Sequence, residues 1–149
     1  MAGSIAFAAI VILLLLMFRN LIDTVLVLIP LVVAMIYSGA IAVFLDMNLN
    51  FANIIALPLL FSLGIAYGVY FIFRQKKLQD LKRIVSTSTP RAILFSALTT
   101  MGAFGSLVLS SHQGTSSMGL LLLIALSMAL LCTFTILPAL LQYRSEKKF

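Results

Sequence analysis

Long apolar runs separated by short polar stretches make up most of the chain. The runs cover about residues 2–18, 24–45, 51–73, 92–109 and 118–142. Each is close to the roughly 20 apolar residues that a helix needs to cross a hydrocarbon core of about 30 Å. The pattern predicts an all-α membrane protein, a bundle of five transmembrane helices that forms a single membrane domain over residues 1–149.

Composition favours a membrane protein over a soluble one. Apolar residues make up 62% of the chain and charged residues 9%, whereas soluble domains carry about 25% charged residues. The net charge is +6, but the basic residues flank the apolar runs and do not alternate with aromatic residues. We therefore expect the lipid bilayer as a partner, and no nucleic acid.

The basic residues also predict an orientation. If the polar stretch after the first run is cytoplasmic, strict alternation places all ten Lys and Arg residues on the cytoplasmic side. Lys and Arg are enriched in cytoplasmic loops. We therefore expect the N-terminus outside and the C-terminus in the cytoplasm. A first run that enters from outside further predicts that the chain continues a longer polypeptide.

The longest polar segment, residues 74–91, is predicted to be a cytoplasmic basic loop. Its apolar residues recur at helical spacing between Lys and Arg. Such an amphipathic segment can lie in the membrane interface and attract anionic lipid headgroups. The alternative is a positively charged topology signal without specific lipid binding.

Small residues interrupt the third and fourth runs. They are Ser62, Gly64, Gly68, Gly102 and Gly105, and Gly64 and Gly68 form a GxxxG motif. Small residues one turn apart let two membrane helices approach closely. We therefore hypothesise that the third and fourth runs pack face to face, with Ala66 near Thr99.

Two prolines lie inside the apolar runs, Pro58 and Pro138. Each removes a backbone donor, so we expect helix bends at both positions. Such a bend can serve as a hinge for transport motions or be a static kink.

Catalytic chemistry has no candidate residues. His112 stands alone in a polar turn, Cys132 is the only cysteine, and no nucleotide-binding motif is present. The carboxylates Asp23 and Asp46 fall at the ends of runs, and no run carries an acid in its interior. We therefore expect no enzyme, no cofactor and no metal site.

Three motifs carry a family resemblance. They are ALPLL (56–60) with the glycines after it, SALTT (96–100) with its downstream glycines, and HQGTSSMG (112–119) leading to LPALL (137–141). From about Phe18 onward the chain resembles the second membrane half of transporters of the resistance-nodulation-division (RND) superfamily. The resemblance is to the branch with the mycobacterial-membrane-protein-large (MMPL) proteins and the hopanoid-associated exporters.

The resemblance implies a function. Such proteins sit in the bacterial inner (cytoplasmic) membrane and export lipids or other hydrophobic molecules, driven by protons. The five runs resemble the last five helices of the second repeat, so we expect dependence on a separately encoded transporter half or on a homo-oligomer. The alternatives are a small non-transporting interaction or lipid-binding protein, and a nonfunctional gene remnant.

The resemblance also implies a proton relay. The family pattern GxGxDYG, laid on residues 62–68, places Ala66 where the relay acid stands, so this chain lacks that acid. The hydroxyl groups that can support a relay whose acid lies elsewhere are those of Tyr67, Ser96, Thr99 and Thr100.

Overall fold

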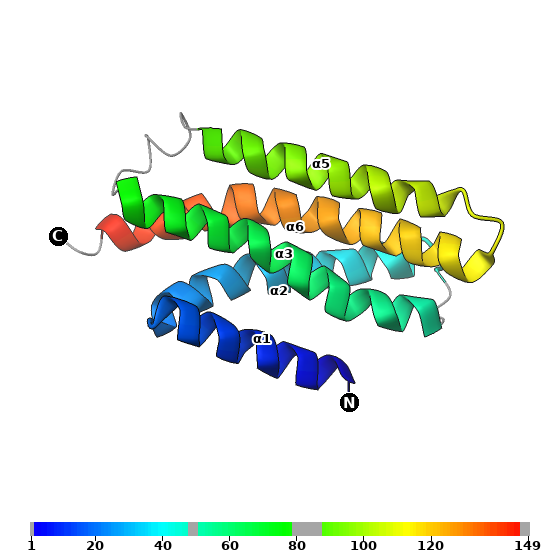
Figure 1. The fold of residues 1–149 in the computed structure, drawn as a ribbon, viewed down its shortest axis with the longest axis horizontal. Helices are drawn as coiled ribbons and strands as arrows, with labels where there is room; N and C mark the ends of the chain where they lie inside the picture. Colours follow the sequence, from blue (N-terminus) through cyan, green and yellow to red (C-terminus); the bar gives the residue numbers. More distant parts are fainter. Residues whose placement is uncertain (1, 48–50, 79–87, 147–149) are drawn as a thin grey trace.

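The structure, a computed structural model, describes residues 2–47, 51–78 and 88–146. The described residues form five α-helices and no strand, which confirms the predicted all-helical fold (Figure 1). The helices are α1 (Ala2–Phe18), α2 (Leu21–Phe44), α3 (Phe51–Leu78), α5 (Ser88–Val108) and α6 (Gln113–Glu146).

Three helices are long and apolar enough to cross a membrane. They are α2, α5, and α6 as far as Arg144. Helix α1 contains a shorter apolar segment, Ala8–Phe18, and α3 carries two lysines in its last turn. The structure thus supports a helical membrane protein, and the number of five crossings stays a prediction.

The breaks around α2 have local causes. Asn20 caps the helix: its side-chain oxygen accepts a hydrogen bond of 3.1 Å from the backbone N–H of Ile22. The residue before it, Arg19, has φ 47°, and Asp46 beyond the other end of the helix has φ 49°. Left-handed residues at both ends stop the helix and let the chain reverse direction.

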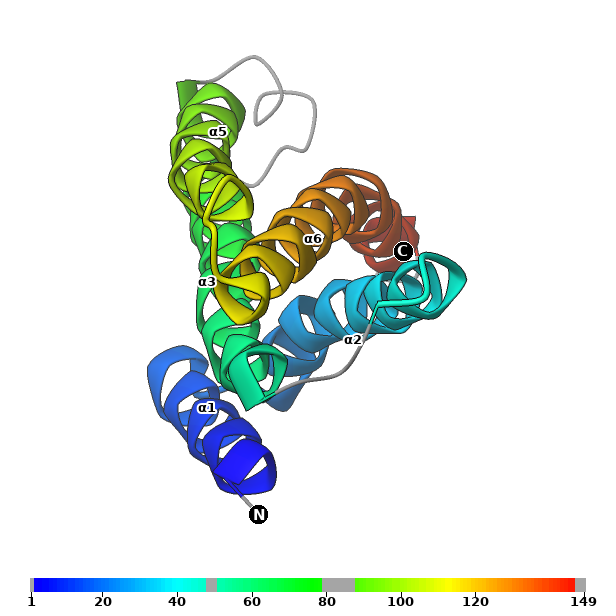
Figure 2. The same cartoon turned by 90° about the vertical axis from the view of Figure 1, so that its right-hand side faces the viewer.

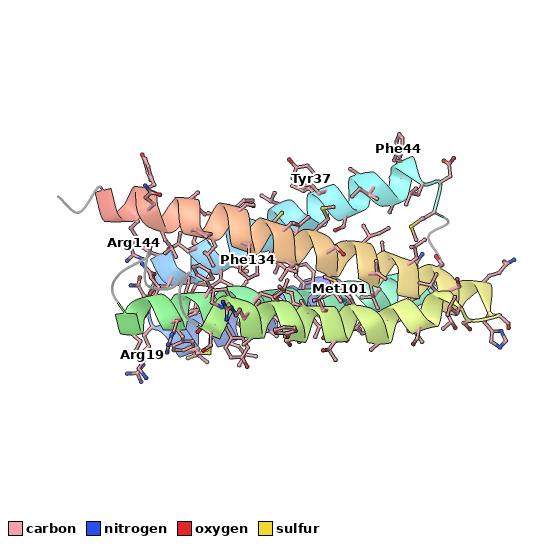
Figure 3. The ribbon with its side chains drawn as sticks, turned by 90° about the horizontal axis from the view of Figure 1, so that it is seen from above. Arg19, Tyr37, Phe44, Met101, Phe134 and Arg144 are labelled. Atoms are coloured by element: carbon pink, nitrogen blue, oxygen red, sulfur yellow. The ribbon has the colours of Figure 1, made fainter. Side chains whose placement is uncertain are left out.

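Successive helices run in opposite directions, so their termini gather at two ends of the bundle (Figure 1). Figure 3 shows Arg19 and Arg144 at one end and Phe44 at the other. We call the first the basic end, because it holds the described Lys and Arg residues Arg19, Arg74, Lys76, Lys77, Arg91 and Arg144. The opposite end, with the C-terminal end of α2 and the start of α6, is the far end.

Helix α6 is the centre of the packing, because it contacts α2, α3 and α5, whereas α1 lies at the periphery (Figure 2). Its side chains Leu122, Leu126 and Leu137 are fully buried, as are Phe71 and Ile72 of α3. These large side chains fill the space between the helices, and close packing is the main attraction between helices in lipid.

Helices α5 and α6 approach each other closely at Gly119. A Cβ atom added at Gly119 would lie 2.9 Å from the Phe104 carbonyl oxygen and 3.0 Å from the Val108 nitrogen. Both neighbours are backbone atoms, which cannot move aside as a flexible side chain can. Gly119 is therefore required for the two backbones to meet.

The hypothesis that α3 and α5 pack through their glycines is wrong about the partner helices. A Cβ at Gly64 would lie 2.5 Å from the Leu31 side chain of α2, and one at Gly68 would lie 3.0 Å from Val27 of α2. On α5, Gly102 has no neighbour within 4 Å and Gly105 faces α6. The glycine face of α3 thus receives α2 and α6, because α6 occupies the centre of the bundle.

Ser62, the remaining member of the small-residue set, is exposed on the bundle surface. The helices also extend beyond several predicted boundaries. Helix α3 continues to Leu78 and α5 begins at Ser88, so both helices extend into the predicted loop 74–91. Most of the predicted amphipathic segment lies in residues 79–87, outside the described residues.

Prolines lie inside three helices. Pro58 is in α3 and Pro138 in α6, as expected, and both helices continue past them. The bends at these two positions stay a prediction. The third proline, Pro30, is fully buried within α2 and was not singled out from the sequence.

Replacing Gly119 by alanine tests the close approach of α5 and α6. We expect Gly119→Ala to lower the free energy of unfolding by about 1–3 kcal/mol, because the added methyl group overpacks a backbone contact. Thermal unfolding in detergent, followed by circular dichroism, measures the change.

The matched control is Gly102→Ala, where the added methyl group meets nothing within 4 Å. Alanine has a higher helix propensity than glycine, so this variant should be as stable as the parent or more so. Equal melting temperatures for the two variants would contradict the packing argument.

Candidate functional site

A buried carboxylate lies at the basic end. Asp23, in the first turn of α2, has a side chain that is only 4% exposed. Its Oδ2 lies 2.6 Å from the Lys76 ammonium of α3, and its Oδ1 accepts a hydrogen bond of 2.7 Å from Nη1 of Arg144 on α6. One acidic side chain therefore joins three helices; we call these three residues the ion-pair cluster.

The cations of the cluster are partly exposed, with Lys76 at 45% and Arg144 at 30%. The Asp23 carboxylate is more buried than either cation, so it loses more of its hydration. It therefore needs both partners, since a buried unpaired charge is strongly destabilising. Aromatic rings complete the setting: the Lys76 ammonium lies 5.3 Å from the centre of the Phe18 ring, which is 5.4 Å from the Phe73 ring. The C-terminal residue of α1 thus lies against the ion-pair cluster.

A second feature is a groove of about 410 Å³ between α3 and α5. It brings together Ala66, Tyr67 and Ser96, three residues that the relay hypothesis selected. Its remaining lining residues are Tyr70, Ser88, Thr89, Ala92 and Ile93. The groove therefore offers several hydroxyl groups in a mixed polar and apolar setting.

The other two relay residues lie outside the lining of this groove. Thr99 donates its hydroxyl to the Phe95 carbonyl and Thr100 donates to the Ser96 carbonyl, each at 2.8 Å. Such bonds to the preceding turn satisfy the hydroxyl within its own helix. Of the predicted set, the structure thus joins Tyr67 and Ser96 around Ala66 and leaves Thr99 and Thr100 apart.

Metal-binding residues are scattered. In the ranges that the structure describes, no three His, Cys, Asp or Glu side chains lie together. His112 is exposed at the far end, and Cys132 is buried in the core. The described residues thus offer hydroxyl groups and the ion-pair cluster as candidate chemistry.

Comparison with known families matches residues 1–148 to the model of the MMPL family. The chain belongs to the MMPL family. The resemblance to the RND superfamily, drawn from the sequence motifs, is thereby confirmed, and the chain is a membrane protein of a transporter family.

Two hopanoid transporters named HpnN are similar to this MMPL chain. The protein of Rhodopseudomonas palustris is 44% identical over 140 residues, and that of Burkholderia multivorans is 45% identical over 133 residues. The alignments cover 94% and 89% of this chain, but 16% and 15% of those proteins. A putative membrane protein of Methanocaldococcus jannaschii is 26% identical over 145 residues, which cover 93% of this chain and 37% of that protein.

The ion-pair cluster of the MMPL chain was not foreseen from its sequence. Asp23 was placed at the end of a run, but its burial and its partners were missed. One feature of the sequence did point to the cluster. Because successive helices are antiparallel, the start of α2 and the C-terminal turns of α3 and α6 all lie on one side of the bundle. Which side chains meet there depends on how each helix is rotated about its axis.

The substitution Asp23→Asn tests the cluster. It removes the charge that Lys76 and Arg144 share, so we expect the free energy of unfolding to fall by about 1–3 kcal/mol. Lys76→Gln should cost less, because Arg144 still pairs with the carboxylate. Thermal unfolding of the purified protein in detergent ranks the variants.

Asp46→Asn is the matched control, since Asp46 is exposed at the far end. Asparagine also tolerates the left-handed backbone found at this position. If Asp23→Asn were no less stable than Asp46→Asn, the structural role of the cluster would be excluded.

Proposed function

We propose that this chain is the membrane segment of a proton-driven exporter of lipids or other hydrophobic molecules. The observation that carries the proposal is membership of the MMPL family together with 44–45% identity to two hopanoid transporters. Because the chain spans 16% and 15% of those transporters, the proposal includes a further transporter half, separately encoded or supplied by a second copy. The chain itself carries out no enzymatic step.

The proposed proton path uses the groove between α3 and α5. Tyr67 and Ser96 offer hydroxyl groups in the groove that Ala66 also lines, and Ala66 is the position that corresponds to the relay acid of the family. Alanine cannot exchange a proton, so the acid must come from the other half. In this proposal the chain shapes the path and its partner supplies the charge.

The proposed orientation follows from the basic end. The described Lys and Arg residues lie there, so positive charge is concentrated on one side of the bundle. We place this end in the cytoplasm and the far end outside, with five crossings of a bacterial inner membrane. Exposed cations such as Lys77 and Arg91 then face the headgroups of anionic lipids.

Cysteine labelling in whole cells tests the orientation. In a Cys132→Ala background, Ser111→Cys at the far end should react with a membrane-impermeant maleimide once the outer membrane is made permeable. Lys77→Cys at the basic end should react only after the inner membrane is disrupted, because the bilayer blocks the reagent. Labelling in the opposite order would refute the proposed orientation.

A chimeric transporter tests the function. The segment of the Burkholderia multivorans hopanoid transporter that aligns with this chain is replaced by this chain, and the chimera is reconstituted in vesicles. We expect transfer of radiolabelled hopanoid to acceptor vesicles to depend on an imposed proton gradient and to stop with a protonophore.

The unmodified hopanoid transporter serves as the positive control, and vesicles without protein as the negative one. A chimera that folds, as judged by size-exclusion chromatography, but transfers no more hopanoid than the empty vesicles would defeat the proposal. Transfer that persists in the presence of the protonophore would defeat its proton-driven part.

A further inference from the structure

An apolar cavity of about 390 Å³ lies toward the far end, between α2, α3 and α6. Figures 2 and 3 show the reason: the C-terminal end of α2, marked by Phe44 in Figure 3, diverges from the start of α6. A cavity of this volume is within the range of ligand sites, about 300–1,000 Å³.

The cavity owes its room to small and adaptable side chains. Ala42, Ala56 and Ala125 face it from three different helices, and a Cβ atom added at Gly39 would meet nothing within 4 Å. Met35 and Met47 also line the cavity. Methionine side chains adjust to irregular apolar shapes, as promiscuous binding surfaces require.

The polar side chains in the lining are already bonded within the protein. The Ser38 hydroxyl donates to the Ala34 carbonyl at 2.6 Å. The Asn53 amide donates to the Ser117 hydroxyl at 3.0 Å. The cavity thus presents a mainly hydrocarbon surface, and an occupant gains by burying apolar surface against it.

A polar cavity of similar volume, about 390 Å³, adjoins the apolar one. Met47 lines both, and the bonded pair Asn53 and Ser117 contributes one member to each. The polar cavity is lined by Met47, Ser110, Ser111, Gln113, Ser116, Ser117 and Leu120. Together the two cavities offer an apolar chamber with a hydroxyl- and amide-lined chamber beside it.

Among the described residues that line the two cavities, none is charged. The described lysines and arginines lie at the opposite end of the bundle. A phosphate placed in the polar chamber would therefore have no cation to pair with among the lining residues, and an ion without a partner pays its desolvation cost in full. The lining favours an uncharged headgroup.

We propose that the two chambers together bind one uncharged amphiphile, a lipid with a bulky apolar body and a hydroxyl-bearing head. The body occupies the chamber between α2, α3 and α6, and the head lies among the serines and Gln113. The inference rests on the proposed export function and narrows its substrate class to lipids with neutral heads.

Photocrosslinking with a neutral amphiphile tests this site. The full chain is placed in phosphatidylcholine nanodiscs that contain cholesterol with a diazirine in its ring system, and the labelled peptides are mapped by mass spectrometry. We expect labels to concentrate in residues 35–47 and 117–125, and unlabelled cholesterol to displace them. Labels distributed over all lipid-facing helix surfaces would overturn the proposal.

A matched pair of glycine variants adds a second readout. Gly39 lines the apolar chamber and Gly102 lies on the surface of α5, and an added Cβ atom at either position meets nothing within 4 Å, so leucine is introduced at each. Because a filled pocket loses its apolar contacts, Gly39→Leu should weaken labelling about tenfold or more. Gly102→Leu should label as the parent does, and equal labelling of the two variants would overturn the proposal.

Competition between lipids tests whether the site prefers an uncharged headgroup. Added phosphatidylglycerol, which is anionic, should leave the labels in place at molar fractions where cholesterol removes them. Displacement by phosphatidylglycerol at equal molar fraction would overturn the neutral-head assignment.

The outcomes for this site and for export are distinguishable. A chimera that transports hopanoid while its parent chain shows no localised labelling would defeat the site and leave the export function standing. Localised labelling in a chain whose chimera transports nothing would support the site and defeat the export function.

Discussion

The ion pair of Asp23 with Lys76 and Arg144 is the constraint on which the arrangement of the bundle depends. It fixes α2, α3 and α6 at the basic end, with the end of α1 held nearby through Phe18. In a lipid environment helices gain little from apolar burial against each other, so specific polar contacts and close packing determine their arrangement. Fixed at one end, α2 diverges at the other, and the far cavities follow from that divergence.

Close packing supplies the second constraint. Gly119 brings α6 against the backbone of α5, while Gly64 and Gly68 receive side chains of α2. Helix α6 is thereby held on several sides and forms the core of the domain. The groove between α3 and α5 lies beside this core. Ala66, Tyr67 and Tyr70 of α3 line it, whereas Asn53, Ala56 and Leu60 of α3 line the apolar cavity nearer the far end.

The sequence predicted the helices well, because the length of an apolar run largely determines a membrane helix. The run 2–18 coincides with α1, the run 51–73 begins at the same residue as α3, and the remaining boundaries differ by up to five residues. Which face of each helix contacts its neighbours could not be predicted from the sequence. Runs that are apolar on all sides, such as that of α6, carry no periodic signal of their rotation, so the partners of Gly64 and of Asp23 required the three-dimensional structure.

Pro30 gives α2 an uneven stiffness. It is fully buried between Asp23 and Gly39, and, lacking an N–H, it leaves the helix one backbone hydrogen bond short at that point. On the N-terminal side of Pro30, Asp23 is held by the ion-pair cluster, and on the C-terminal side, Met35, Ser38 and Gly39 line the apolar cavity. The missing hydrogen bond therefore separates the part of α2 that the ion pairs hold from the part that lines the cavity.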